Sequence, residues 1–259
     1  MQSAAATALA MTWTARLLAG SIAVQASEML VVRRAFGDDG PFVWRVARER
    51  GALDRVLTHG FIALQVAELM LALLLSCCSS PWVVGPLFVC ALLTTLRFRG
   101  GYNGGSDAMT IVVLLGLTVA TLARELGAND VWQRVGLGYI AAQLVLSYFV
   151  AGCAKLRDAA WRQGDALGRL VRTRQYAVPS RFAHWLSWPL CSRVLGTFVV
   201  LFELATPLVF VEPHVAYGFF AVSAGFHLAI AIVLGLNRFV WAWLAAYPAL
   251  WLFTLGNLR

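Results

Sequence analysis

A single lysine, Lys155, stands where an apolar stretch of the sequence turns polar. The chain carries 21 basic residues, and the others are all arginines. Trp161 follows closely, among alternating arginines and aspartates. An ammonium at the edge of hydrocarbon either reaches outward to lipid phosphates or takes part in chemistry inside the protein. In the second case, Lys155 is a candidate base that exchanges a proton with a bound molecule.

A histidine and several carboxylates lie within apolar stretches. His227 is one candidate, because an imidazole can both donate and accept a hydrogen bond; the alternative is a structural bond to a neighbouring helix. Three glutamates follow runs of apolar and small residues: Glu28, Glu68 and Glu203. Such carboxylates normally face the bundle interior, either at a functional site or paired with an arginine such as Arg16 or Arg193. Both alternatives stay open, and Glu203 is retained as a candidate ligand-binding residue.

The segment from Arg97 to Asp107 is rich in glycine. Its four glycines fall within six residues and let the backbone approach a ligand closely. Four polar residues here are candidate ligand-binding residues: Tyr102, Asn103, Ser106 and Asp107. The last two could instead cap the following helix by accepting hydrogen bonds from its free N–H groups. The segment is therefore either a pocket-lining loop or a capping turn.

The sequence gives no reason to expect a metal, a haem or a nucleic acid. Its four histidines show no paired spacing on one predicted helix, and its five cysteines form no C-x-x-C motif. The net charge of +8 comes from arginines in a few loops, which suits the anionic surface of a membrane better than nucleic acid.

These residues must be positioned by membrane helices. With 60% hydrophobic and 13% charged residues, the chain is too apolar to hide its side chains in a soluble core. We predict an all-α, polytopic helix bundle that forms one transmembrane domain over residues 1–259. About eight apolar stretches are long enough to span a bilayer. They cover residues 10–32, 56–77, 81–97, 108–123, 135–156, 193–211, 216–236 and 239–256.

The connections between these stretches differ in charge. Residues 33–55 and 157–192 hold six arginines each, whereas 78–81 and 212–215 hold none. The positive-inside rule then places both termini outside and the arginine-rich loops in the cytoplasm, as in a bacterial inner membrane. Segment 157–192 is predicted to lie at the cytoplasmic interface as amphipathic helices broken at Pro179.

Several segments resemble a known family. YFVAGCAKLRDAAWRQGDAL is similar to the lysine–tryptophan–glycine stretch of the vitamin K-dependent γ-glutamyl carboxylase and its bacterial relatives, the HTTM (horizontally transferred transmembrane) proteins. RGGYNGGSDAM looks like their polar loop, and GFHLAIAIVLGLNRFVWAW looks like their F-H segment and the helix after it. Together with DDGPFVWRV, the likeness covers most of the chain.

The resemblance implies a quinone pocket. In the carboxylase, the lysine that matches Lys155 deprotonates the vitamin K hydroquinone, and the segment that matches His227 contributes to the same pocket. Asn103 matches a polar-loop asparagine, but the histidine of that loop is replaced by Gly-Gly-Ser-Asp. Glutamate carboxylation is not expected, because the large lumenal domain that holds the protein substrate has no counterpart here. The family's site opens to the lumen, whereas the arginines place Lys155 near the cytoplasm.

Two functions remain open, and the sequence does not decide whether the protein is an enzyme. The first is a protein that binds a quinone or another isoprenoid lipid, without a metal or haem, as a component of a membrane oxidoreductase. Lys155 and His227 would exchange protons with the ligand, and Asn103, Trp161 and Glu203 would help to hold it. The second is a non-catalytic subunit that stabilises a larger membrane complex through a protein partner and membrane lipids. A channel or carrier is disfavoured, because the spans show neither a duplicated half nor a ring of charge.

Overall fold

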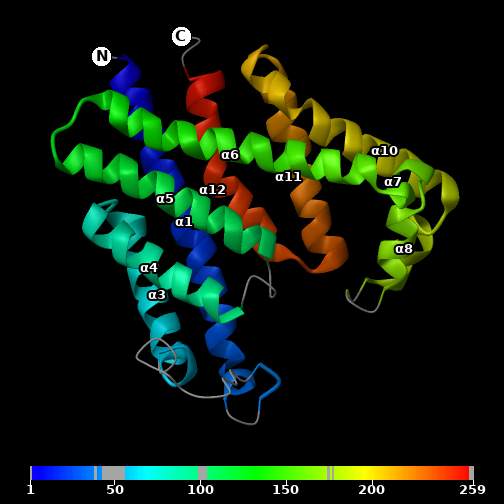
Figure 1. The fold of residues 1–259 in the computed structure, drawn as a ribbon, viewed down its shortest axis with the longest axis horizontal. Coiled ribbons are helices and arrows are strands. Elements are labelled where there is room, and N and C mark those ends of the chain that lie inside the picture. The colour runs from blue at the N-terminus through cyan, green and yellow to red at the C-terminus, as the bar shows by residue number, and fades with distance from the viewer. Residues whose placement is uncertain are drawn as a thin grey trace. The chain divides into compact units, whose positions relative to one another are not determined.

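The computed structural model describes residues 2–37, 40–42, 56–98, 104–173, 176 and 178–256. All regular structure in these ranges is helical (Figure 1). The long helices are α1 (Gln2–Val31), α3 (Phe61–Cys77), α4 (Pro81–Phe98), α5 (Gly104–Glu125), α6 (Asp130–Arg157), α10 (Pro189–Ala205), α11 (Val215–Leu234) and α12 (Asn237–Thr254). The short ones are η1 (Arg33–Phe36), α7 (Ala159–Gln163), α8 (Ala166–Arg172), α9 (Ser180–Leu186) and η2 (Thr206–Phe210).

Six helical segments in the described part of the chain are long and apolar enough to cross a membrane. They are Ala4–Val31, Pro81–Phe98, Gly105–Glu125, Asp130–Arg157, Pro189–Phe210 and Pro213–Leu234. This agrees with the predicted all-α integral membrane protein. The other two predicted spans correspond to α3 and α12, which are not among the six. With 17 residues, α3 is about 25 Å long, somewhat less than a hydrocarbon core. The count of eight spans therefore stays a prediction.

The chain forms two compact units. The first comprises Met1–Ile140 and Trp241–Leu252, and the second comprises Ala141–Val240 and Phe253–Arg259. One boundary falls within α6 and the other two within α12, so both helices contribute to both units. The single transmembrane domain over residues 1–259 stays a prediction.

In the first unit, α1 and α4 each pack against α3 and α5. Helices α5 and α6 touch through glycines: a Cβ atom on Gly136 would lie 2.4 Å from the carbonyl oxygen of Gly116. A buried polar chain joins α3 to α4. Gln65 donates to the Thr94 hydroxyl at 2.9 Å, and Thr94 donates to the Glu68 carboxylate at 2.6 Å. Glu68, one of the glutamates singled out in the sequence, thus faces the interior of this unit.

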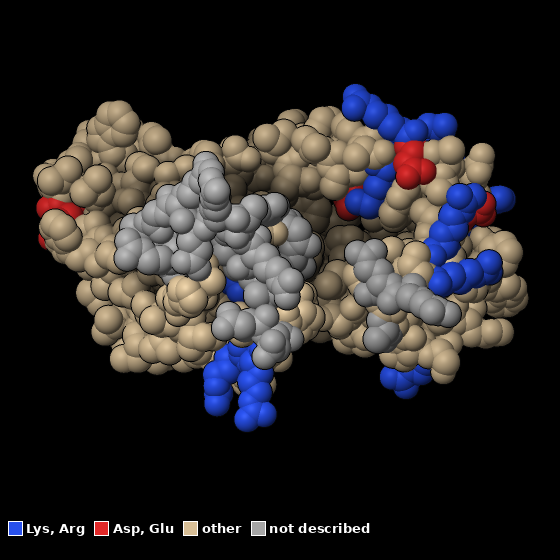
Figure 2. All heavy atoms as spheres, turned by 60° about the horizontal axis from the view of Figure 1, so that its bottom comes forward, with Lys and Arg blue, Asp and Glu red and all other residues tan. Residues whose placement is uncertain are grey.

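In the second unit, α10 packs against α7, α8, α9 and η2. The short helices form the segment that the sequence predicts to be interfacial. Helix α9 begins directly after Pro179, as expected for a break there. An additional break, which was not predicted, separates α7 from α8 at Gly164, whose φ is +81°. Figure 2 shows blue arginine and lysine side chains gathered at the side of the molecule where α7 and α8 lie in Figure 1.

Candidate functional site

One face of α6 carries the residues from which the candidate site is built. Tyr148, Gly152 and Lys155 follow at intervals of four and three residues, which places them on the same side of an α-helix. Tyr148 and Lys155 are two turns apart, or about 10 Å along the helix axis. This face therefore holds two polar groups with a glycine between them, and each group meets a different partner helix.

Lys155 is held in an ion pair with Glu203 of α10. The ammonium Nζ lies 2.7 Å from each carboxylate oxygen, and the side chains are 22% and 3% exposed, respectively. Trp161 covers the same ammonium, with its ring centroid 5.3 Å from Nζ. The structure thus brings together three predicted site residues. It also corrects the suggested partner of Glu203, because Arg193 instead reaches the carbonyl oxygen of Gln163 at 3.4 Å.

Glycines allow the close approach that this ion pair needs. A Cβ atom on Gly152 would lie 3.0 Å from both the Glu203 Cβ and the Leu204 amide nitrogen. On α10, the position of a Cβ on Gly196 is 3.8 Å from the Trp161 ring. The two helices therefore pack closely where Lys155 meets Glu203, and the indole ring of Trp161 rests on α10 beside them.

A hydroxyl of α10 fixes the turn that follows Trp161. Ser192 donates to the carbonyl oxygen of Gly164 at 2.6 Å and accepts from the amide of Gly168 at 3.2 Å. Gly164 occupies the left-handed region at the end of α7, and a Cβ atom there would lie 2.7 Å from the Cβ of Arg193. The lysine, tryptophan and glycine of the YFVAGCAKLRDAAWRQG stretch therefore share one structural role, which is to attach the α6–α7–α8 corner to α10.

The second polar group joins α6 to α11. The Tyr148 hydroxyl lies 2.5 Å from Nε2 of His227 and 2.5 Å from the Ser223 hydroxyl. All three side chains are buried. Ser223 and His227 are four residues apart on α11, so both face α6. A phenol between an imidazole and a hydroxyl can pass a proton from a neighbouring molecule to the imidazole.

Aromatic rings surround this cluster, which we call the Tyr148–Ser223–His227 cluster. Phe202 and Phe219 stand edge-on to the Tyr148 ring, at centroid distances of 5.7 and 5.4 Å. Phe226 and Phe239 lie against the His227 ring at 5.3 and 6.5 Å. The polar atoms are therefore enclosed in an apolar shell, in which hydrogen bonds are stronger than in water.

An apolar groove adjoins the cluster. It has a volume of about 260 Å³ and runs between α10, η2 and α11. Phe202 and Phe219, which contact Tyr148, also line the groove, together with Thr206, His214 and Gly218. The groove and the Tyr148–Ser223–His227 cluster thus share two aromatic walls within the second unit.

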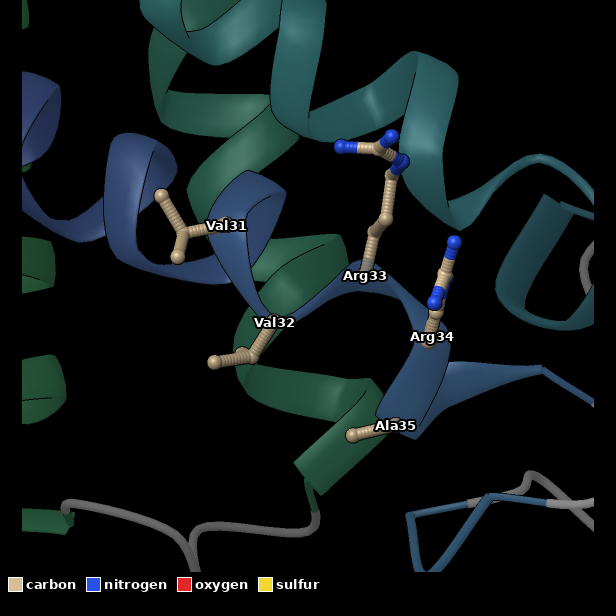
Figure 3. A pocket seen from close by; sticks show the side chains of 5 residues that line it. All are labelled: Val31, Val32, Arg33, Arg34 and Ala35. Atoms are coloured by element: carbon tan, nitrogen blue, oxygen red, sulfur yellow. The ribbon is translucent and has the colours of Figure 1, made fainter.

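A separate hollow of about 410 Å³ lies at the end of α1, in the first unit. Figure 3 shows that the Arg33 and Arg34 side chains point away from those of Val31 and Val32 there. None of the predicted site residues that the structure describes lines this hollow.

The remaining predicted residues belong to the glycine-rich segment. Tyr102 and Asn103 lie outside the described residues. Ser106 and Asp107 are buried in the first unit, but they do not precede their helix as a cap would. Helix α5 already begins at Gly104, so both lie in its first turn, where a carboxylate also suits the positive end of the helix dipole. A pocket shared by these residues with Lys155 and His227 stays a prediction.

Sequence reasoning did not single out Tyr148 and Ser223 as site residues. Tyr148 opens the stretch that drew attention to Lys155, and it precedes Lys155 by two helical turns. Ser223 precedes His227 by one turn. A search for polar residues one or two turns from each candidate would have found both, because such residues share a helix face.

No protein-family model, curated protein or solved structure matches this chain.

Proposed function

We propose that this integral membrane protein binds a quinone or a similar isoprenoid lipid in its second unit and exchanges a proton with it. The observation that carries the proposal is the hydrogen-bonded Tyr148–Ser223–His227 cluster beside an open apolar groove. The groove suits an isoprenoid tail, and the cluster suits a ring oxygen that accepts or releases a proton. A quinone-linked oxidoreductase is the enzyme class that would use such a site.

The proton step is assigned to Tyr148 and His227. A hydroquinone hydroxyl would give its proton to the Tyr148 oxygen while the Tyr148 proton moves to Nε2 of His227. The ligand becomes an anion, and its electrons stay on the ring. Lys155 has a different part in this proposal from the one suggested by the sequence. Because its ammonium is already engaged by Glu203 and Trp161, it supports the site by holding α6 against α10.

A binding titration with decylubiquinone, a quinone with a short alkyl tail, tests this proposal on the purified protein. Tyr148→Phe removes the hydroxyl, and Gly218→Leu fills the groove at a position where a Cβ meets no atom within 4 Å. Each change should weaken binding about tenfold. Gly225→Leu is the matched control, because Gly225 also lies on α11 in open space but does not line the groove. Wild-type affinity in both Tyr148→Phe and Gly218→Leu would overturn the proposal.

A second candidate is a non-catalytic subunit of a larger membrane complex. The internal engagement of Lys155 favours it, because the lysine–tryptophan–glycine stretch then serves packing alone. Mass spectrometry of molecules that copurify in mild detergent separates the two candidates. A stable protein partner without any quinone would favour the subunit, and a bound quinone would favour the first function.

The family and the location are proposals of the same kind. The HTTM-like segments support kinship with the membrane part of the γ-glutamyl carboxylase. The arginine distribution supports a bacterial inner membrane, with segment 157–192 on the cytoplasmic side.

A further inference from the structure

The short helices α7 to α9 and the start of α10 form a basic surface segment, residues 157–193, which we call the arginine platform. Among the residues that the structure describes, it contains six arginines against two aspartates. Not every arginine is available to a partner. The Arg162 guanidinium donates to the carbonyl oxygens of Leu156 and Arg157, at 3.2 and 2.6 Å, and thereby caps the end of α6. A partner of the platform must therefore bind to the other arginines.

Helix α8 has one basic face and one buried face. Arg169 and Arg172 are three residues apart and both exposed, whereas Gly168 and Val171 are buried. Arg169 pairs with Asp165 at 3.4 Å, and both side chains are more than half exposed. Such an exposed pair is weak, so Arg169 can exchange this carboxylate for another anion.

Helix α9 adds aromatic groups to this basic face. Arg181 and Trp185 are four residues apart and both exposed, so they share one side of the helix. Beyond the helix, Trp188 and Leu190 are also exposed, at 63% and 67%. Tryptophan is enriched at the headgroup level of membranes, where its ring meets hydrocarbon and its N–H meets polar groups.

We propose that the arginine platform binds the phosphates of an anionic phospholipid leaflet, with Trp185 and Trp188 at headgroup depth. Arginine forms paired hydrogen bonds with phosphate, and the excess of arginine over aspartate favours a negatively charged surface. The exposed tryptophans favour a membrane over a soluble acidic protein as the partner, because tryptophan is enriched where hydrocarbon meets the polar headgroups. The Ser192 bridge to Gly164 and Gly168 holds the start of α8 to α10, so Arg169 and Arg172 are presented at a fixed place on the second unit.

The experiment measures the thermal unfolding midpoint of the full chain in dodecylmaltoside, with added phosphatidylglycerol or phosphatidylcholine. Phosphatidylglycerol should raise the midpoint more than phosphatidylcholine does, and 1 M salt, with a screening length of about 3 Å, should remove the difference. The double variant Arg169→Gln/Arg172→Gln should lose about half of that difference. Trp185→Ala should reduce the response to both lipids. Arg33→Gln/Arg34→Gln is the matched control, because it removes two exposed charges outside the platform.

Three outcomes would overturn the proposal. The first is an unchanged phosphatidylglycerol response in Arg169→Gln/Arg172→Gln. The second is an equal loss in that variant and the Arg33→Gln/Arg34→Gln control, which would indicate a general charge effect. The third is a copurifying protein that is lost from Arg169→Gln/Arg172→Gln while the lipid response persists, since the platform would then serve a protein partner. A variant could already unfold at a lower temperature than the wild type without added lipid. For such a variant, native mass spectrometry of the retained phosphatidylglycerol provides the comparison instead.

Discussion

Removal of Lys155 should destabilise the protein, because it leaves the buried Glu203 carboxylate without its partner. Lys155→Met deprives a 3% exposed carboxylate of its partner. We expect a loss of about 3 kcal/mol in the free energy of unfolding, because a buried charge without its partner is costly. The measurement is reversible unfolding in mixed micelles. Arg169→Gln is the control, since its pair with Asp165 is exposed and should be worth less than about 1 kcal/mol.

The double variant Lys155→Met/Glu203→Gln distinguishes the ion pair from simple packing of the lysine stem. If the cost comes from the abandoned carboxylate, the second change should recover most of it. A double variant no more stable than Lys155→Met alone would contradict this explanation.

At the same scale, the sequence could identify which side chains are unusual but not which ones meet. Lys155, Glu203, Trp161 and His227 stand out because ionisable or amphipathic groups are rare at membrane depth. The pairing of Lys155 with Glu203 depends on the packing of α6 against α10, and 48 positions separate the two residues. Tyr148 was overlooked because a tyrosine within an apolar helix is ordinary until its hydroxyl is seen beside an imidazole.

At the scale of helices, Gly152 should control the contact between α6 and α10. Gly152→Ala places a Cβ 3.0 Å from Glu203 Cβ and the Leu204 amide nitrogen, so the helices must move apart slightly. We expect a destabilisation of about 1–2 kcal/mol, measured by unfolding in micelles. Gly225→Ala on α11 meets nothing within 4 Å and should instead stabilise by about 0.5–1 kcal/mol through helix propensity. Equal effects would show that Gly152 has no special packing role.

The turn at Gly164 should be more sensitive than a similar turn elsewhere. Gly127 and Gly164 both have positive φ, at +63° and +81°, but only Gly164 faces another side chain closely. Gly127→Ala should cost about 1 kcal/mol from backbone strain alone. Gly164→Ala should cost more, because its Cβ would lie 2.7 Å from the Cβ of Arg193. Thermal unfolding of the two variants provides the comparison, and a smaller effect at Gly164 would contradict it.

Helix boundaries show where sequence reasoning at this scale succeeds and fails. Long apolar runs located the helices, and Pro179 correctly marked a break before α9. The break at Gly164 was missed, because a glycine between Gln163 and Asp165 does not reveal its left-handed φ. A cap at Ser106 or Asp107 was one of two alternatives, because serine and aspartate are common at that position, yet helix α5 starts at Gly104 despite its two leading glycines.

For the whole molecule, the membrane topology depends on whether α3 crosses the bilayer. Composition and apolar length established an all-helical membrane protein, but α3 is only 17 residues long. If α3 crosses, the positive-inside arrangement places Cys77 and Cys78 outside and the arginine platform in the cytoplasm. If it does not cross, Cys77 and Cys78 stay on the same side as Arg33. The two arrangements differ in which cysteines an external reagent can reach.

Labelling of intact cells with a membrane-impermeant maleimide decides between them. Both Cys77 and Cys78 are free and exposed, so they should react at the outer surface if α3 spans the membrane. Cys77→Ser/Cys78→Ser should abolish this labelling. In that background, Ser180→Cys at the start of α9 should react only after the cells are permeabilised. Labelling of Ser180→Cys in intact cells would contradict the predicted cytoplasmic location of the arginine platform. Arg34→Cys in the Cys77→Ser/Cys78→Ser background tells whether α3 crosses, because Arg34 lies before α3 and is exposed. If Arg34→Cys is labelled on the side opposite to Cys77 and Cys78, α3 spans the membrane; labelling on the same side would leave α3 outside the set of spanning helices.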